Sequence, residues 1–250
     1  MTHTTAFHDK MLPDQALHSD QFAGAREGFF PALFDTIART SGIRTPYEEL
    51  DLVTSDKFTV EEMGSNPIAL RFLQLLIRLS RARRVLEIGA FIGVSAMYMA
   101  KALPPGGEMV TIEKFDHFAD ICRRNFERNG LADRITLLQG DADTVIDGLP
   151  RDRPFDMMFI DGNKERYADY MRRLEPLLAP GGLMIVDDAL FHGDALNAKP
   201  RTEKGQGVRD CLELAREWTG YCRVLLPVAN GMLLMVKPPS PTTAPAARAG

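Results

Sequence analysis

Apolar residues recur along this chain at two different spacings. From residue 21 to 44 and from residue 66 to 80 they return every three or four positions, which predicts two amphipathic helices. Gly42 marks the expected end of the first helix, and Pro67 suits the first turn of the second. After residue 84 the pattern changes to short apolar runs that alternate with helical stretches, an arrangement typical of repeated β-α units.

Five of the short apolar runs have the length of buried strands. They read RRVLEIG, EMVTIE, RITLLQG, FDMMFID and GGLMIVDD, and helices are expected between them over residues 95–103, 115–129 and 164–178. Beyond residue 207 we expect one further helix to about residue 219, followed by the runs YCRVLLPV and GMLLMVK. An Asn-Gly turn between these two runs favours an antiparallel hairpin. We therefore predict an α/β fold of the Rossmann-like, doubly wound class, with a mostly parallel seven-stranded sheet, an antiparallel C-terminal hairpin and additional N-terminal helices.

The two ends of the chain differ in composition from its middle. Residues 1–20 are polar and contain three of the five histidines at spacings that fit no common metal motif, so we expect a disordered or tethered arm. Residues 238–250 are rich in proline and alanine and are expected to form a disordered tail. The segment 21–237 is then predicted to be one catalytic domain.

The overall composition identifies no partner but argues against several classes of protein. The chain is 45% hydrophobic and 26% charged with a formal net charge of -4, which is ordinary for a soluble protein and argues against nucleic acid as the main ligand. It shows no apolar run long enough to cross a membrane and no secretion signal. Its three cysteines form no C-x-x-C pair, which indicates a reducing compartment without a disulfide framework or zinc site. We expect a cytoplasmic protein without a membrane or nucleic-acid partner.

The segment VLEIGAFIGVS, residues 85–95, joins a strand to a helix through a glycine-rich turn. Gly89 lets the backbone turn tightly and approach a ligand, and the amides at the start of the next helix suit an anionic group such as a carboxylate. The dinucleotide spacing G-x-G-x-x-G is absent. The pattern therefore favours S-adenosylmethionine over a nicotinamide cofactor.

Two acids follow on the next two strands. Glu113 ends EMVTIE, where a carboxylate can accept hydrogen bonds from both hydroxyls of a ribose. The alternative for Glu113 is a solvated acid at a strand end. Asp141 lies in the GDA block after the following strand, in position to meet an adenine, to cap the next helix, or to do both.

Further acidic residues gather at the ends of two more strands. Asp161 ends FDMMFID, with Lys164 three residues on, and Asp187 and Asp188 end GGLMIVDD. Three carboxylates at the tips of adjacent strands repel one another unless they are neutralised, and a hard divalent cation with oxygen ligands does this. Each acid alone also has a plain structural explanation at a strand end.

From about residue 63 to residue 215 the sequence resembles the cation-dependent O-methyltransferases, the family of the catechol and caffeoyl-CoA O-methyltransferases. The blocks that carry the resemblance occur in that family's order and at its spacing, and they are MGSNP, LEIGAFIGVSA, TIEK, GDA, FIDGNKERY, APGG and VDDALFHG. The resemblance implies an O-methyltransferase that uses S-adenosylmethionine and a divalent cation, Mg²⁺ in the first place and Mn²⁺ or Ca²⁺ as alternatives.

Carried over position by position, the resemblance implies a role for each matching residue. The residues implied to contact the cofactor are Met63, Glu87, Gly89, Phe91, Ser95, Glu113, Asp141, Ala142 and Asp161. The implied metal ligands are Asp161, Asp187 and Asp188. Lys164 is the implied general base, Asp161 is implied to be catalytic with it, and Phe191 is implied to pack against the acceptor. Asp188 departs from the family, which usually has asparagine there, and adds a charge that would tighten metal binding or change the metal preferred.

Two acceptor classes remain open. The lead hypothesis is a catechol-like vicinal diol on an aromatic small molecule, whose two oxygens chelate the cation while Lys164 receives the hydroxyl proton. The alternative is a non-aromatic 2-hydroxy acyl group on a coenzyme or carrier protein, which also presents two oxygens. A lysine beside a metal and a sulfonium has its charged form disfavoured, which suits a base. A catalytically silent cofactor-binding module is disfavoured because both Asp161 and Lys164 are present.

Three surface features concern the acceptor and the partners. The polar segment 191–206 is interpreted as a lid or rim over the acceptor, with His192 either an accessory base or, more simply, a surface histidine. Arginine clusters at 81–84, 123–124 and 172–173 either dock an acidic carrier protein or form solvated helix faces. A homodimer is predicted from the resemblance and from an aromatic helix face. The residues of that face are Phe22, Phe29, Phe30 and Phe34.

Overall fold

The computed structural model describes residues 36–37, 39–43, 47 and 49–240. The chain divides into two compact units, Met1–Pro46 and Tyr47–Gly250. In the first unit the helix predicted over 21–44 is described only near its end, where Gly42 has a φ of 68° and its amide donates to the carbonyl of Arg39. That terminus agrees with the predicted glycine end. The predicted N-terminal arm, the aromatic face and the tail from residue 241 lie outside the described residues.

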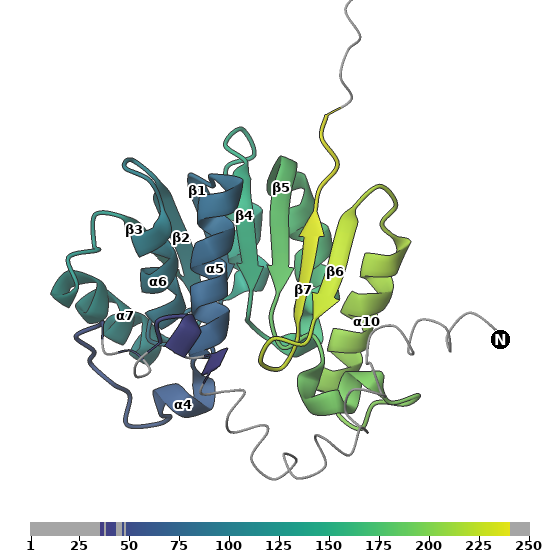
Figure 1. Ribbon diagram of the computed structural model, residues 1–250, viewed down its shortest axis with the longest axis horizontal. Helices are drawn as coiled ribbons and strands as arrows, with labels where there is room; N and C mark the ends of the chain where they lie inside the picture. The colour runs from purple at the N-terminus through teal and green to yellow at the C-terminus, as the bar shows by residue number, and fades with distance from the viewer. Residues whose placement is uncertain (1–35, 38, 44–46, 48, 241–250) are drawn as a thin grey trace, which may run out of the picture. The chain divides into compact units, whose positions relative to one another are not determined.

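A seven-stranded sheet forms the centre of the second unit (Figure 1). Its strands are β1 (Arg84–Ile88), β2 (Glu108–Glu113), β3 (Ile135–Gln139), β4 (Phe155–Ile160), β5 (Leu178–Val186), β6 (Cys222–Leu226) and β7 (Met232–Val236). The spatial order is β3-β2-β1-β4-β5-β7-β6. The first five strands pair in parallel, while β7 is antiparallel to both β5 and β6. The predicted Rossmann-like sheet with a C-terminal hairpin is confirmed.

Helices cover both faces of this sheet. The α-helices are α4 (Val60–Met63), α5 (Pro67–Ser80), α6 (Val94–Ala102), α7 (Asp116–Arg128), α8 (Ala142–Val145), α9 (Tyr167–Leu174) and α10 (Glu203–Glu217). The 3-10 helices are η2 (Ile146–Gly148), η3 (Lys164–Arg166), η4 (Glu175–Leu177) and η5 (Phe191–Leu196). None of the helices in the described ranges combines the length and the apolar composition needed to span a bilayer.

Successive strand residues enter two separate cores. Val85 and Met157 pack in the core that contains α5, α6 and α7, whereas Leu86 and Met158 pack in the core that contains α9 and α10. The alternation follows from the pleat of a strand, which sends neighbouring side chains to opposite faces. Both faces of β1 and β4 are therefore apolar at these positions, and most of the polar side chains lie towards the strand ends.

Side chains cap two helices that matter for the site. Asn66 starts α5 by accepting the Ile68 amide at 2.9 Å, with Pro67 in the first turn as predicted. Thr202 starts α10 in the same way, because its hydroxyl accepts the Gly205 amide at 2.9 Å. Since α10 begins at Glu203, the prediction that the loop continues to residue 206 is wrong.

Candidate active site

The carboxyl ends of four adjacent parallel strands meet at one edge of the sheet. Gly89 follows β1, Glu113 ends β2, Asp161 follows β4 and Asp187 follows β5. The sheet order places these strands side by side as β2-β1-β4-β5. Open α/β sheets bind their ligands at this edge. The fold therefore brings the predicted cofactor, base and metal residues into one region.

The turn after β1 is pressed against the end of β4. Gly89 has a φ of 93°, a backbone conformation that side chains rarely allow. A Cβ at this position would lie 2.4 Å from the carbonyl oxygen of Asp161, so a larger residue does not fit. Phe91, in the same turn, also has a positive φ, of 52°. The predicted cofactor turn thus lies directly against the main chain of the predicted catalytic aspartate.

Glu113 is a buried acid whose carboxylate is held by two main-chain amides. The residue is 5% exposed, and its Oε2 accepts the Phe91 N–H at 2.8 Å while its Oε1 accepts the Phe115 N–H at 2.9 Å. Burial raises the pKa of Glu113, and the backbone hydrogen bonds oppose that rise. The alternative of a solvated strand-end acid does not hold, because the carboxylate is enclosed and ties together the turns after β1 and β2.

Glu87, in β1, is fully buried. Its Oε2 accepts the Thr111 hydroxyl at 2.6 Å, the Ser95 hydroxyl is a second partner, and Oε1 has no partner. Burial raises the pKa of Glu87 to about 8, while the two hydroxyl hydrogen bonds oppose the rise. The carboxyl group is therefore mostly protonated at neutral pH. Ser95, predicted to contact the cofactor, is buried and bonded to Glu87.

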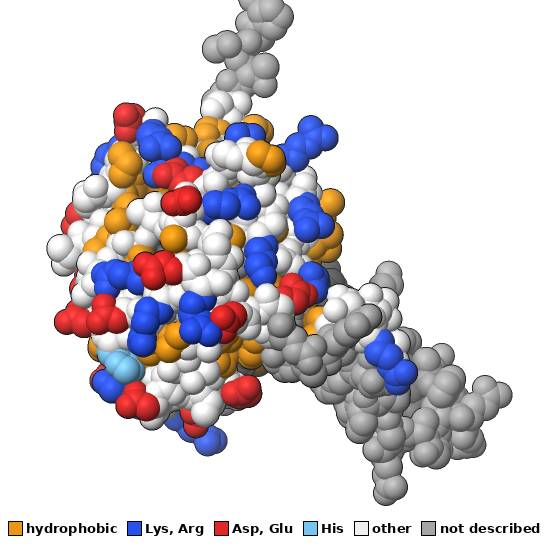
Figure 2. Space-filling model, turned by 90° about the vertical axis from the view of Figure 1, so that its left-hand side faces the viewer, with side chains coloured by type: hydrophobic (Ala, Val, Ile, Leu, Met, Phe, Trp, Pro, Cys, Tyr) orange, Lys and Arg blue, Asp and Glu red, His pale blue; other side chains and the backbone are white. Residues whose placement is uncertain are grey.

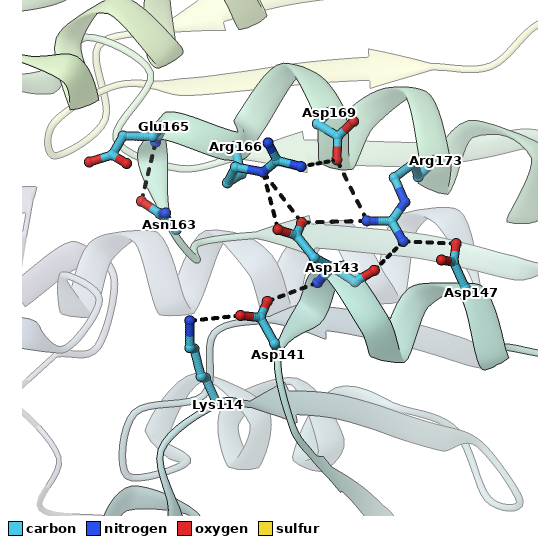
Figure 3. A network of polar contacts seen from close by, with 9 residues as sticks. All are labelled: Lys114, Asp141, Asp143, Asp147, Asn163, Glu165, Arg166, Asp169 and Arg173. Atoms are coloured by element: carbon cyan, nitrogen blue, oxygen red, sulfur yellow. Dashed lines mark hydrogen bonds and ion pairs between the residues drawn. The ribbon is translucent and has the colours of Figure 1, made fainter.

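Asp141 caps α8, which was one of the two roles considered for it. Its Oδ1 accepts the Asp143 N–H at 3.0 Å, and its Oδ2 lies 2.7 Å from Nζ of Lys114 (Figure 3). The hydrogen bond from Lys114 lowers the pKa of Asp141. Ala142, the first residue of α8, is buried. Because Lys114 follows Glu113, this ion pair connects the ends of β2 and β3.

Lys164 lies between two carboxylates. Its Nζ is 2.7 Å from Oδ1 of Asp161 and 2.9 Å from Oδ2 of Asp188. Asp188 also accepts a hydrogen bond from the side-chain amide of Asn230 at 3.0 Å, and Asp187 accepts the Asp188 N–H at 2.9 Å. The predicted base and the three predicted metal ligands therefore lie together at the ends of β4 and β5.

The charge state of this group differs from what a base requires. Burial lowers the pKa of Lys164, but the charges of Asp161 and its neighbours outweigh burial and raise the pKa. Burial also raises the pKa of Asp161 and, more strongly, that of Asp187. Lys164 is therefore an ammonium group here. The paired carboxylates dominate in this arrangement. The expectation that the charged form is disfavoured concerns a lysine beside a metal and a sulfonium, and it stays a prediction.

The three aspartates fit a hard divalent cation in the kind of ligand that they offer, since Mg²⁺, Mn²⁺ and Ca²⁺ prefer carboxylate oxygens. Two of them, Asp161 and Asp188, are placed as ion-pair partners of the Lys164 ammonium group. Within the part of the chain that the structure describes, no three His, Cys, Asp or Glu side chains are grouped so as to hold a metal ion. The ammonium group of Lys164 contacts one carboxylate oxygen each of Asp161 and Asp188, so a cation held by all three aspartates would share two of its ligands with Lys164.

Two residues outside the predicted set complete this group. Tyr167 is fully buried, its hydroxyl has no hydrogen-bond partner among the residues that the structure describes, and its ring centre lies 5.6 Å from Nζ of Lys164. Asn230, predicted only as a turn residue, bonds Asp188 and also accepts the His192 N–H at 2.7 Å. Tyr167 ends the FIDGNKERY block, so this motif could have indicated that it belongs to the site. No local pattern connects Asn230 with Asp188.

The segment after β5 is the one predicted to form an acceptor rim, and that role stays a prediction. Phe191 is partly buried and His192 is exposed, and their φ angles are 42° and 52°. Asp194 closes the segment by accepting the Arg201 N–H at 2.8 Å and the Thr202 hydroxyl at 2.7 Å. Met63, implied to contact the cofactor, is 48% exposed at the end of α4.

The N-terminal part of α10 packs closely on the segment that contains Lys164, the predicted base. A Cβ at Gly207 would lie 2.4 Å from the carbonyl oxygen of Lys164. Only glycine lets the two backbones approach this closely. Glycine is a poor helix former, so the sequence pattern placed the start of this helix after residue 207, whereas α10 begins at Glu203.

Residues 40–238 match the family model described as O-methyltransferase, a span that contains every residue assigned to the site. The chain belongs to the O-methyltransferase family. The family resemblance drawn from the motifs is thereby confirmed, and with it the expectation of a family of methyltransferase enzymes.

Known members of the O-methyltransferase family share both sequence and fold with this chain. A catechol O-methyltransferase from Niastella koreensis is 34% identical over 141 residues, which cover 56% of this chain and 64% of that protein. Caffeoyl-CoA O-methyltransferase 1 from Eucalyptus globulus is 32% identical over 206 residues, covering 76% of this chain and 80% of that protein. The structure of an O-methyltransferase from Bacillus cereus in complex with SAH has a TM-score of 0.67 at 31% identity, covering 70% and 83% of the two chains. The chain thus spans just under two thirds of the length of the Niastella protein, at 64%.

In this member of the O-methyltransferase family, arginines from all three predicted basic clusters have internal partners. The pairs are Arg84 with Glu108 at 2.9 Å, Arg123 with Asp120 at 2.6 Å and Arg173 with Asp147 at 2.8 Å. Figure 2 shows one face of the molecule, on which Lys and Arg side chains are interspersed with Asp and Glu and form no single basic patch. Of these three arginines, Arg84 lies on β1, and Arg123 and Arg173 lie on α7 and α9. Docking of an acidic carrier protein stays a prediction.

Proposed function

We propose that this chain transfers a methyl group from S-adenosylmethionine to a hydroxyl of a small molecule that offers two adjacent oxygens, with a divalent cation held by Asp161, Asp187 and Asp188. One observation carries the proposal. The Gly89 turn lies against Asp161, and Asp161 is bonded to Lys164. A methyl donor bound at the turn and a hydroxyl bound at Lys164 would be neighbours, and such proximity is the main requirement for direct transfer.

The cofactor is proposed to lie across the ends of β1, β2 and β3. The two amides that bond Glu113 orient its carboxylate and leave each oxygen a further lone pair for a ribose hydroxyl. Asp141 lies one strand further along, where it would meet the adenine. The Bacillus cereus structure, which contains SAH, supports this assignment.

The proposed reaction moves one methyl group and one proton. The acceptor oxygen forms a bond to the methyl carbon while the sulfur-methyl bond breaks, the electron pair of that bond stays on sulfur, and the hydroxyl proton passes to Nζ of Lys164. Lys164 can accept this proton only as a neutral amine, and its contacts with Asp161 and Asp188 hold it charged. A divalent cation on the three aspartates would supply the positive charge that offsets these carboxylates and lowers the pKa of the acceptor hydroxyl.

The acceptor class is proposed to be a catechol-like aromatic diol. Phe191 supports it, because the Phe191 N–H donates to the carbonyl oxygen of Asp188 at 2.9 Å, which ties an aromatic residue to the acidic group. An aromatic acceptor that chelated a cation through two adjacent oxygens would lie near the backbone of an aromatic residue whose side chain could pack against it. The names of the Niastella and Eucalyptus relatives, which cite catechol and caffeoyl-CoA, support the same class.

A transfer assay with methyl-labelled S-adenosylmethionine and catechol tests the proposal. We expect labelled product with Mg²⁺ and a loss of about 100-fold or more with EDTA, the scale of losing a charged contact to the transition state. Asp187→Ala should behave like EDTA treatment. Asp120→Ala, at an aspartate side chain of α7 that is 68% exposed, is the matched control and should retain the rate.

Two outcomes would contradict parts of this proposal. Full transfer in the presence of EDTA would remove the cation and the roles of the three aspartates. Label entering a 2-hydroxy acyl thioester in preference to catechol would replace the aromatic diol by the other acceptor class.

A further inference from the structure

A network of charged side chains joins the cofactor end of the proposed site to the base end (Figure 3). Its centre is Asp143 on α8, whose carboxylate lies 3.2 Å from Nε of Arg166 and 3.4 Å from Nη1 of Arg173. Arg173 also donates to the main-chain carbonyl of Asp143 and lies 2.8 Å from Asp147, while Arg166 lies 2.9 Å from Asp169. We call these five residues, Asp143, Asp147, Arg166, Asp169 and Arg173, the α8 clamp.

At the cofactor end, the α8 clamp holds the turn that Asp141 caps. The Asp143 N–H donates to Oδ1 of Asp141 at 3.0 Å, so the orientation of the Asp141 carboxylate depends on where α8 lies. The helix has only four residues, and a single helical turn has little stability of its own. Its position is therefore set by its contacts, among which the two guanidinium groups grip both the side chain and the main chain of Asp143.

At the base end, the α8 clamp holds the segment that begins with Lys164. Arg166 is the last residue of η3, and Lys164 is the first. The 3-10 turn is closed by the Arg166 N–H, which donates to the carbonyl of Asn163 at 2.9 Å. Arg173 lies further along α9, which continues directly from η3. The clamp therefore grips the base-carrying segment at two points.

We infer that Arg166 and Arg173 are positioning residues which, through Asp143, hold Asp141 and Lys164 at a set separation, so that binding of the cofactor's adenosine end steadies the base. The inference rests on the proposed function, because it takes Asp141 as a cofactor contact and Lys164 as the base. The α8 clamp is a physical link between these two residues, which neither the motifs nor their direct contacts provide.

A purely structural role for the α8 clamp makes a different prediction. The side chains of Arg166 and Asp143 are 44% and 38% exposed, and exposed ion pairs contribute little to folding stability. If the network served only the fold, cutting it would change neither the response of the Lys164 segment to the cofactor nor the turnover. If the network sets the separation of Asp141 and Lys164, cutting it changes both, because small displacements of a catalytic group lower the rate.

Amide hydrogen–deuterium exchange of the full chain, with and without S-adenosylhomocysteine, tests the link. In the wild-type protein this ligand should slow exchange over residues 163–167 by about tenfold or more, as expected when local opening is suppressed. Asp143→Asn keeps the shape of the side chain and removes its charge, and most of the ligand-dependent slowing should be lost. Exchange in β1 and β4 should stay unchanged, which shows that the fold is intact.

Asp120→Asn is the matched control for this experiment. Asp120 also pairs with an arginine, Arg123 at 2.6 Å, but it lies on α7 outside the clamp. The control should show the wild-type slowing.

Steady-state kinetics supply a second readout. Asp143→Asn and Arg166→Ala should each lower kcat by about tenfold with little change in the KM of the acceptor, because the base is displaced while the acceptor contacts remain. The double variant should lose no more than either single variant, since both changes cut the same link. Arg166→Lys keeps a positive charge near Asp143 and should recover part of the rate.

The possible failures are distinct. Ligand-dependent slowing that persists in Asp143→Asn overturns the inference and leaves the proposed function in place, as do additive losses in the double variant. A wild-type protein that does not bind S-adenosylhomocysteine in the same experiment overturns the proposed cofactor site, and the inference falls with it.

Discussion

The two halves of the candidate site are built from different kinds of contact. In the half formed by β1 and β2, main-chain amides hold the acid, because Glu113 accepts the N–H groups of Phe91 and Phe115. In the half formed by β4 and β5, side-chain charges hold one another, because Lys164 lies between Asp161 and Asp188. A main-chain hydrogen bond is in place once the backbone has folded, whereas an ion pair rearranges when a new charge arrives. The first half is suited to binding one ligand in one geometry, and the second is suited to changing partners.

Backbone strain is also distributed unequally between the halves. In the second half Asp188, Phe191 and His192 have positive φ angles, of 52°, 42° and 52°. In the first half, Phe91 in the predicted cofactor turn also has a positive φ. Each such residue costs on the order of 1–3 kcal/mol and persists only where its surroundings hold it. Asn230 does so here, because it bonds both the Asp188 carboxylate and the His192 amide.

The largest effect is expected from removing the charged centre of the second half. Lys164→Ala should lower the methyl-transfer rate by roughly 10²- to 10⁴-fold, the range for losing a general base. Calorimetric affinity for S-adenosylhomocysteine should change by less than about threefold, because the base acts on the acceptor. Lys101→Ala is the control, since the Lys101 ammonium bonds the Glu49 carbonyl and should not affect the rate. A wild-type rate in Lys164→Ala would show that the proton goes elsewhere.

A smaller effect, confined to binding, is expected in the first half. Glu113→Ala should weaken the affinity for S-adenosylhomocysteine by about 5- to 150-fold, which corresponds to about 1–3 kcal/mol for leaving buried polar groups without partners. Glu108→Ala, at the other end of β2, is the matched control and should bind normally. Calorimetry that gives the same affinity for Glu113→Ala and the wild type would mean that ribose recognition lies elsewhere.

The smallest effect concerns stability and pH. Burial raises the pKa of Glu87 in the folded protein to about 8 from an ordinary 4.5. Between these values the folded state binds more protons than the unfolded chain, so the contribution of Glu87 to stability falls as pH rises from 4.5 towards 8. Glu87→Gln cannot ionise and should remove this loss.

Thermal unfolding at a series of pH values measures this difference. The Tm of the wild type, relative to that of Glu87→Gln, should fall by at least about 2–4 °C between pH 5 and pH 8, the shift that about 1 kcal/mol produces in a chain of this size. Glu108→Gln should follow the wild type. Parallel curves for Glu87→Gln and the wild type would argue that Glu87 is not a buried protonated acid.

What could be predicted from the sequence follows the same division between main-chain and side-chain contacts. The succession of strands along the chain, the Gly89 turn and the strand-end position of Glu113 depend on short, local blocks, and the structure contains all of them. The bond between Asn230 and Asp188 joins residues 42 positions apart, and no periodicity or motif connects them. The ammonium form of Lys164 depends on the balance between its burial and two carboxylates, which requires a three-dimensional arrangement.

Gly207 allows the N-terminal part of α10 to rest on the main chain of Lys164. The same helix is capped by Thr202, whose hydroxyl bonds Asp194 in the predicted acceptor rim. Directed evolution of this protein would meet that arrangement as a constraint, because substitutions at the start of α10 that were chosen to widen the choice of acceptor would also move Lys164, the proposed base. Substrate range and turnover would then change together. Leu196, which is 62% exposed on the rim, is a position where a library can vary the entrance while α10 stays seated.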